Sequence, residues 1–171
     1  MSELTEQKHS AVHLEAILVP TDFSEYADYA LEYALFFAKR YKAKVVLAHV
    51  MAPYFSGTEA DVFAVPSAYY SKDLMGILHE RLTEVANQVR KQDVQVETIL
   101  TMGVPFVEIV RLAKRKDIGL IVIATHGRSG LSHLVMGSTA ERVVRKAPCP
   151  VLSVRPPQTE GEDAEAKTEG S

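Results

Sequence analysis

The sequence predicts an α/β fold in which a parallel sheet is covered by helices on both faces. Short apolar runs, typical of strands buried on both sides, alternate with longer segments whose apolar residues recur at helical spacing. Five such alternations are typical of chains built from right-handed β-α-β crossovers. A length of 171 residues suits one domain. We therefore expect a single-domain, open, twisted, parallel sheet of five strands.

The first half of the chain predicts two strands and a helix. An apolar run over 16–19, closed by Pro20, predicts the first strand. The N-cap residue types at 21–24 precede a helix predicted over 24–41, which has one apolar face. A second buried strand is predicted over 44–50 after a very short turn.

A long connection over 51–70 interrupts this economical pattern. It contains Pro53, Gly57 and Pro66 together with five aromatic residues. Connections of this length are usually functional or disordered, and the aromatic content argues against simple disorder. A lid over a ligand, an irregular packed insertion and part of a dimer contact all remain open interpretations.

The second half of the chain returns to regular alternation. The predicted elements are a helix over 71–92, a strand over 95–101, a helix that begins at Pro105 and ends at the basic residues 114–116, a strand over 120–124, a helix over 138–146 and a strand over 151–154.

Composition excludes several classes of function. No apolar run is long enough to span a bilayer and no signal peptide is present, so we expect a cytoplasmic protein without membrane contact. The single Cys149 excludes an internal disulfide, and its apolar surroundings predict a packed residue. Residues 156–171 carry −4 and residues 1–155 sum to +1, so the body lacks the basic face of a nucleic-acid-binding protein. We expect a flexible segment at 1–14, a domain at 15–155 and a disordered acidic tail at 156–171.

A glycine-punctuated loop follows the fourth strand, in the stretch IVIATHGRSGLSHLVMGS at 121–138. Gly127, Gly130 and Gly137 allow the backbone to approach a ligand closely. The helix start at Ser138 offers N–H groups and partial positive charge to an anion. We expect this loop to hold phosphate. The alternative is a glycine-rich surface loop capped by its own side chains.

Polar side chains around this loop could contribute further contacts. Arg128 and the hydroxyls of Thr125, Ser129, Ser132 and Thr139 are the candidates. Ser138 and Glu141 also match the S-x-x-E capping box, in which Ser138 is the N-cap. In that box the Glu141 carboxylate would occupy the Ser138 N–H that a phosphate requires, and the sequence leaves this conflict open.

Strand ends indicate where a nucleotide would lie. In open parallel sheets, ligands bind beyond the carboxyl ends of the strands, at the point where the winding direction reverses. The ends at 20–22, 50–51 and 124–127 are available here, with His49 and His126 nearby. Either histidine could touch a ligand, although satisfaction by the backbone is the commoner outcome. The chain contains no Walker motif, dinucleotide fingerprint, nucleophile elbow or metal-ligand spacing, so hydrolysis would be incidental.

Several motifs together resemble the universal stress protein family, over about residues 15–155. They are PTDFS at 20–24, LAHV at 47–50, GVP at 103–105, the stretch 124–138, and APCPV at 147–151. The resemblance implies a Rossmann-like, adenine nucleotide alpha hydrolase-like fold. It also implies strand order 3-2-1-4-5 and a homodimer formed through the last strand.

Site residues follow from the same resemblance. It implies that Asp22 and Val50 hold adenine or ribose, that Pro20 and Thr21 line the same end, and that the phosphates are surrounded by Gly127, Gly130, Gly137, Ser138 and Thr139. The ligand would be ATP or AMP, with Mg²⁺ or Mn²⁺ held largely by the phosphates and water. One position departs from the ATP-binding pattern G-x-x-G, nine residues, G-S, because Ala124 replaces the first glycine. Its methyl group is tolerable with ordinary strand dihedrals and obstructive if backbone there must contact phosphate.

The expected function is therefore a nucleotide-dependent dimeric regulator in the stress response, without catalytic residues. A nucleotide-independent dimeric scaffold is the alternative, and a weak ATPase is a third hypothesis. Dimerisation has a physical motive as well, since the last strand, Val151-Leu152-Ser153-Val154, is too apolar for an exposed sheet edge.

Overall fold

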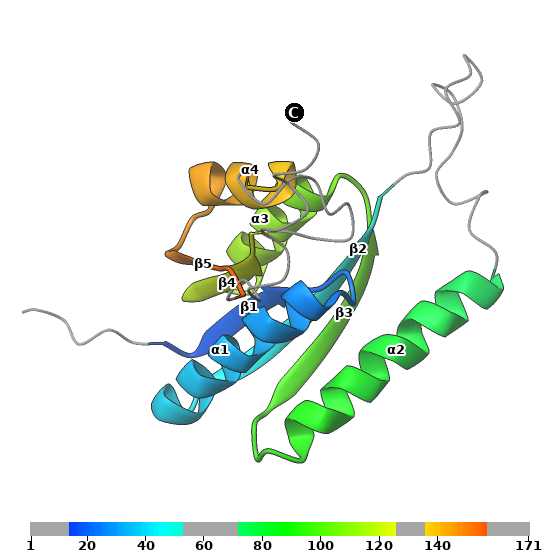
Figure 1. Cartoon of the computed structure of the whole chain (residues 1–171), viewed down its shortest axis with the longest axis horizontal. Coiled ribbons are helices and arrows are strands. Elements are labelled where there is room, and N and C mark those ends of the chain that lie inside the picture. Colours follow the sequence, from blue (N-terminus) through cyan, green and yellow to red (C-terminus); the bar gives the residue numbers. More distant parts are fainter. Residues whose placement is uncertain (1–13, 53–71, 126–135, 157–171) are drawn as a thin grey trace, which may run out of the picture.

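The computed structural model describes residues 14–52, 72–125 and 136–156, which form an alternating β/α array (Figure 1). The predicted elements are confirmed, with bounds that differ by at most two residues. They are β1 (Ala16–Pro20), α1 (Glu25–Tyr41), β2 (Lys44–Met51), α2 (Lys72–Arg90), β3 (Val96–Met102), α3 (Pro105–Arg115), β4 (Leu120–Ala124), α4 (Ser138–Lys146) and β5 (Val151–Val154).

The sheet has the predicted order β3-β2-β1-β4-β5, and all four neighbouring pairs are parallel. In the central register, Ile17 of β1 pairs with Val45 of β2 on one side and with Leu120 of β4 on the other. From β1, the chain adds β2 and then β3 on one side of the sheet. It then returns to the other side of β1 and adds β4 and β5. The winding direction therefore reverses between β1 and β4, where a crevice opens at their carboxyl ends.

Strand side chains alternate between two cores because successive residues point to opposite faces of a sheet. Ile17 and Val122 belong to the core beneath α1 and α2, whereas Leu18 and Ile121 belong to the core beneath α3 and α4. All four are fully buried, and burying an aliphatic side chain of this size contributes about 1.5–3 kcal/mol. Two apolar faces explain why the strands read as continuous apolar runs.

The turn between β1 and α1 is fixed by its own side chains. Ser24 is the N-cap of α1, as its residue type predicted, and its hydroxyl accepts from the Ala27 N–H. Asp22 Oδ1 in turn accepts from the backbone N–H and the hydroxyl of Ser24. Phe23, between them, has φ 62°, in the left-handed region. This geometry holds the Asp22 carboxylate at the carboxyl edge of the sheet.

Several expectations concern residues outside this part of the chain. The segments 1–13, 53–71 and 157–171 include most of the proposed N-terminal segment, the long connection and the acidic tail, and they lie outside the described residues. Cys149 is half-buried, and burial raises the pKa of its thiol, which fits a packed residue. Among the helices in the described ranges, none has the length and apolar character needed to cross a membrane.

Candidate functional site

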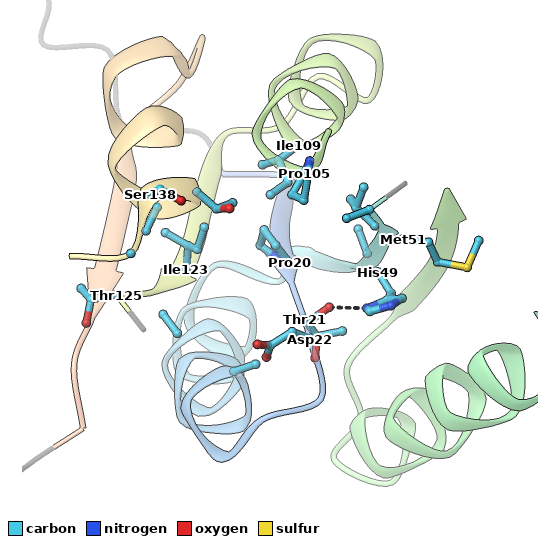
Figure 2. A pocket seen from close by; sticks show the side chains of 18 residues that line it. Pro20, Thr21, Asp22, His49, Met51, Pro105, Ile109, Ile123, Thr125 and Ser138 are labelled. Atoms are coloured by element: carbon cyan, nitrogen blue, oxygen red, sulfur yellow. Dashed lines mark hydrogen bonds between the residues drawn. The ribbon is translucent and has the colours of Figure 1, made fainter. Parts of the chain in front are cut away.

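A cavity of about 550 Å³ lies at the carboxyl ends of β1, β2 and β4 (Figure 2). The first residues of α3 and α4 complete its wall, so two helix N-termini face the same space. Figure 2 shows Pro20 near the centre of the lining, with Pro105 and Ser138 on one side and Asp22 and His49 on the other. The cavity occupies the crevice where the winding direction of the sheet reverses.

Seven of the ten site residues named from the sequence line this one cavity: Pro20, Thr21, Asp22, Val50, Gly137, Ser138 and Thr139. They come from three separate parts of the chain, which the sheet order brings together. The other three, Gly127, Arg128 and Gly130, lie outside the described residues, as does His126.

The ends of β1 and β2 are joined by a histidine contact. His49 Nδ1 lies 2.7 Å from the carbonyl oxygen of Thr21, and the backbone N–H of Thr21 donates to the Ala48 carbonyl. A carbonyl only accepts, so this nitrogen of His49 carries the proton. The His49 ring also lies against Phe23, with ring centroids 4.6 Å apart, and the Arg81 guanidinium covers Phe23. His49 thus bonds to backbone, the commoner of the two outcomes considered from the sequence.

The Asp22 carboxylate gives the α1 side of the cavity a negative charge. Burial, followed by the nearby charge of Asp22, raises the pKa of Asp28 above its usual value. Of these two carboxylates, Asp22 lines the cavity, where it disfavours a bound phosphate and favours hydroxyl or amino groups that can donate hydrogen bonds. The opposite side holds the N-terminus of α4, whose partial positive charge suits an anion.

The junction between β4 and α4 depends on a close backbone approach. The Gly137 N–H donates to the Thr125 carbonyl oxygen at 2.7 Å. A Cβ at Gly137 would lie 3.1 Å from that oxygen, tighter than an ordinary contact. With φ −57° and ψ 141°, Gly137 has a backbone conformation open to other residues, so close approach is the physical reason for glycine here.

The capping box predicted for α4 is wrong. Gly137, not Ser138, is the N-cap residue, and its cap has no side-chain hydrogen bond. Glu141 instead points along the helix to Arg145, with 3.0 Å between Oε1 and Nη2. Ser138 is the first helical residue and lines the cavity. Glu141 therefore does not engage the N-terminal N–H groups, which removes the conflict with an anion.

Ala124 has ordinary strand geometry. It is the last residue of β4, it pairs with Val154, and it is absent from the residues with positive φ. Although Ala124 borders the cavity, its side chain packs against the core beneath α1, on the face of the sheet opposite α4. Of the two outcomes left open by the sequence, this geometry matches the tolerable one.

Sequence reasoning missed the contribution of α3 to the cavity. Pro105 and Ile109 line it, and neither was among the predicted site residues. The signal was available, because α3 and α4 both follow strands of a parallel sheet, and their N-termini must therefore emerge at the carboxyl edge. The motif GVP at 103–105 marks that turn, where Gly103 has φ 146°.

Metal-binding groups do not cluster in the structure as far as it is described. Within residues 14–52, 72–125 and 136–156, no three His, Cys, Asp or Glu side chains gather closely enough to hold a metal ion. A divalent cation at this cavity would have to receive most of its ligands from a bound anion and water.

Comparison with known proteins agrees with the fold. The model of the Universal stress protein family matches residues 13–155. The chain belongs to the universal stress protein family. A universal stress protein of Methanocaldococcus jannaschii is 34% identical over 149 residues, covering 84% of each chain. Another, from Bacillus subtilis, is 33% identical over 157 residues, covering 81% of this chain and 97% of that protein.

Solved structures of the family superpose on the same fold. The universal stress protein UspA from Lactobacillus plantarum has a TM-score of 0.73 and 26% identity, covering 85% of this chain and all of that one. Two further universal stress proteins were solved in complex with cAMP and with dAMP, the latter from Archaeoglobus fulgidus. Their TM-scores are 0.59 and 0.61 at 23% and 21% identity, covering 84% of this chain and 98% of each of theirs, which establishes likeness of fold alone.

Proposed function

We propose that this universal stress protein binds an adenine nucleotide, ATP or AMP, in the cavity at the carboxyl ends of β1, β2 and β4. The observation that carries the proposal is the division of the cavity into two ends of different character. A carboxylate and apolar residues form one end, and the N-terminus of α4 forms the other. A nucleotide has matching parts, a weakly polar base and ribose joined to an anion. The cAMP and dAMP complexes of the related structures support the same ligand class.

The base and ribose belong at the end formed by β1 and β2. Asp22 can accept hydrogen bonds from ribose hydroxyls, while Pro20, Thr21 and Val50 supply the surface on which the base and sugar lie. The Asp22 carboxylate also directs the phosphates away from this end. This division assigns each half of the ligand to the residues that match its charge.

The phosphates belong at the start of α4. Gly137, Ser138 and Thr139 line the cavity there, and the first turn of a helix presents N–H groups that the helix itself does not use. Gly127, Arg128 and Gly130 would complete the phosphate site from the preceding loop. Mg²⁺ or Mn²⁺ would be held mainly by the phosphates and water, with the hydroxyls of Ser138 and Thr139 as its nearest protein groups.

Regulation through a dimer is the second part of the proposal. β5 is an end strand of the sheet, and Val151 and Leu152 are only half-buried. Pairing of Val151–Val154 with a second copy would cover this edge. β5 also adjoins the cavity through β4, because the Thr125 N–H donates to the Val154 carbonyl at 2.9 Å. Nucleotide binding and dimerisation would therefore involve neighbouring backbone segments. We place this regulation in the cytoplasm.

Titration calorimetry of the full chain with ATP and AMP, with and without Mg²⁺, tests the proposal. Saturable heat with a stoichiometry of one nucleotide per chain is the expected result. Absence of heat would favour the nucleotide-independent scaffold. Phosphate release above background, measured with nucleotide and metal saturating, would instead favour the ATPase. Mass spectrometry of small molecules that copurify with the protein provides an independent readout of the ligand.

A further inference from the structure

Helix α1 carries a line of aromatic side chains on its outer surface. We define the aromatic stripe as Tyr26, Tyr29, Tyr33, Phe36 and Phe37, which recur at three- and four-residue spacing and so share one side of the helix. Phe36 is 67% exposed and Tyr33 is 41% exposed. The rings contact one another, Tyr29 with Tyr33 edge-to-face at 5.3 Å between centroids and Phe36 with Phe37 at 5.4 Å. Exposed aromatic residues in such a line are typical of an interaction surface.

The stripe lies on the flank of α1 that faces away from α2. On the opposite flank, Lys39 Nζ donates to Gln92 Oε1 at 2.7 Å. Asp28 lies close enough to Arg81 of α2 for the charge of Arg81 to act on the Asp28 carboxylate. The side away from α2 is the side toward β4 and β5, as the positions of α1, α2 and β5 in Figure 1 show. Phe37 and Leu152 of β5 pack against the same core cluster. The stripe therefore adjoins the open edge of the sheet.

Charges along α1 are segregated in a self-complementary way. Glu25 lies four residues before Tyr29, and Arg40 lies four residues after Phe36, so these two charges extend the line of the stripe at its two ends. Asp28 and Lys39 lie on the flank toward α2 and take no part. If two copies of α1 run antiparallel, the acidic end of each meets the basic end of the other. Parallel copies would place like charges together. This distribution is compatible with a second copy of the same chain, related by a two-fold axis, and the position of the stripe beside the open β5 edge favours that partner.

We propose that the aromatic stripe is the helical part of a two-fold interface, in which α1 packs antiparallel to α1 of a second copy beside the paired β5 edges. The proposal rests on the dimer proposed above and adds a specific surface and register to it. The pairing that centres the stripe places Tyr33 opposite the partner's Tyr33. It also places Tyr26 opposite the partner's Arg40, where a cation–π contact can form.

The available area supports two contributions to one interface. Tyr26, Tyr29 and Phe37 are partly covered within the chain, whereas Phe36 and Tyr33 are the more exposed rings. Aromatic side chains bury roughly 150–250 Å² each when fully covered, so the exposed parts of the five offer at most roughly 400 Å² per copy. A stable interface needs about 800 Å² per partner. The stripe alone therefore falls short, and the adjoining β5 edge supplies the other half. Neither surface by itself makes a standard interface.

A charge-reversal pair at position 33 tests this register in the full-length protein. Tyr33→Glu and Tyr33→Lys each place like charges opposite one another across the axis. Sedimentation analysis should show that the dissociation constant of each homodimer rises by about tenfold or more. Mixing the two variants should restore dimerisation, because a heterodimer pairs Glu with Lys. Circular dichroism verifies that each variant is folded, and Phe36→Glu provides a second disruptive variant on the most exposed ring.

A matched control comes from an exposed apolar residue elsewhere. Ile77 on α2 is 54% exposed and lies outside the stripe, so Ile77→Glu should leave the dissociation constant unchanged. Dimers that persist in Tyr33→Glu and Phe36→Glu would overturn the inference while leaving a dimer built on β5 alone. Failure of the mixture to recover would overturn the two-fold register. A wild-type chain that is monomeric throughout would overturn both, and calorimetry would still decide nucleotide binding separately.

Discussion

Gly137 donates its backbone N–H to the carbonyl oxygen of Thr125, and this 2.7 Å bond joins the start of α4 to the end of β4. Thr125 and Gly137, on either side of residues 126–135, are therefore adjacent in space. Because the cavity is lined by both residues, the bond also fixes the position of the α4 N-terminus relative to the strand ends. The proposed phosphate site therefore depends on a contact that only a residue without a side chain makes without displacement.

Gly137→Ala is expected to weaken ATP binding by about tenfold, equivalent to about 1.4 kcal/mol. The added Cβ would lie 3.1 Å from Thr125 O, so α4 or the strand end must shift by a few tenths of an ångström. Titration calorimetry measures the effect. The control is Gly76→Ala, because nothing lies within 4 Å of a Cβ at that helical position. That control should bind ATP normally and gain about 0.5–1 kcal/mol of stability. Unchanged binding in Gly137→Ala would contradict the phosphate assignment.

Ala124→Gly is expected to leave ATP affinity within about twofold of wild type. The Ala124 side chain packs toward α1 in ordinary strand geometry, so its removal frees no space at the α4 N-terminus. The free energy of unfolding should fall by about 0.5–1 kcal/mol, since glycine in a strand loses backbone entropy and packing. Calorimetry and chemical denaturation measure the two quantities. A wild-type chain that binds no ATP and gains binding with this change would show that the methyl group obstructs the site.

The layout of the fold followed from local patterns that tertiary contacts reinforce. Burial on both faces of the sheet requires continuous apolar runs such as 44–50. Burial on one face of α1 requires apolar residues at helical spacing. The strand order came from family resemblance, because alternation alone fits several windings. Sequence placed residues of β1, β2 and α4 at one site, since parallel strands all end at the same edge.

Contacts that depend on competition between partners could not be predicted in the same way. The S-x-x-E pattern favoured a capping box, but Glu141 forms an i, i+4 pair with Arg145 and the helix begins one residue earlier than the box requires. The direction of the Ala124 side chain likewise depends on the strand register, which a motif does not contain. Pro105 and Ile109 differ from these cases, because the motif GVP at 103–105 indicated that a helix starts at the carboxyl edge of the sheet, where both residues line the cavity.

Asp22→Asn is expected to reduce ATP affinity by about tenfold while changing stability by less than about 0.5 kcal/mol. Asparagine keeps a side-chain oxygen for Ser24, whose N–H lies 3.1 Å from Asp22 Oδ1, but loses the charge that strengthens hydrogen bonds from ribose hydroxyls. Asp22→Ala removes both roles and should also destabilise the start of α1 by about 1 kcal/mol. Comparison of the two variants by calorimetry and thermal denaturation separates binding from structure. Equal ATP affinity in Asp22→Asn and wild type would exclude a charged contact.

Glu97→Gln is expected to remove a pH-dependent part of the stability. Lys116 donates to the Glu97 carboxylate, and Lys44 Nζ lies 3.5 Å from it. The hydrogen bond from Lys116 is the main cause of the lowered pKa of Glu97, and the charges of both lysines add to it. A lowered pKa of Glu97 in the folded chain stabilises the fold at pH values above the pKa of the unfolded chain, about 4.3. This stability is lost as the pH falls through the pKa of the folded chain.

Solvent screening limits the size of that effect, because Glu97 is about one-third exposed. We expect Glu97→Gln to lower the free energy of unfolding by a few tenths to about 1 kcal/mol at neutral pH. Urea denaturation from neutral to acidic pH should show the difference from wild type vanishing at the acid end. Glu84→Gln, at an exposed position of α2, is the control and should show no such trend. A difference that grows in acid would contradict the sign.

Ser153→Pro is expected to abolish dimerisation through β5 while preserving the fold. The carbonyls of Pro150 and Val154 accept from β4 and its following residue, so these residues face β4 and the alternate residues Val151 and Ser153 face the open edge. Proline at 153 therefore removes an N–H that only a new neighbouring strand would use. Sedimentation should give a monomer, with thermal unfolding close to that of wild type. Persistence of the dimer in this variant would show that copies associate through a surface other than the β5 edge.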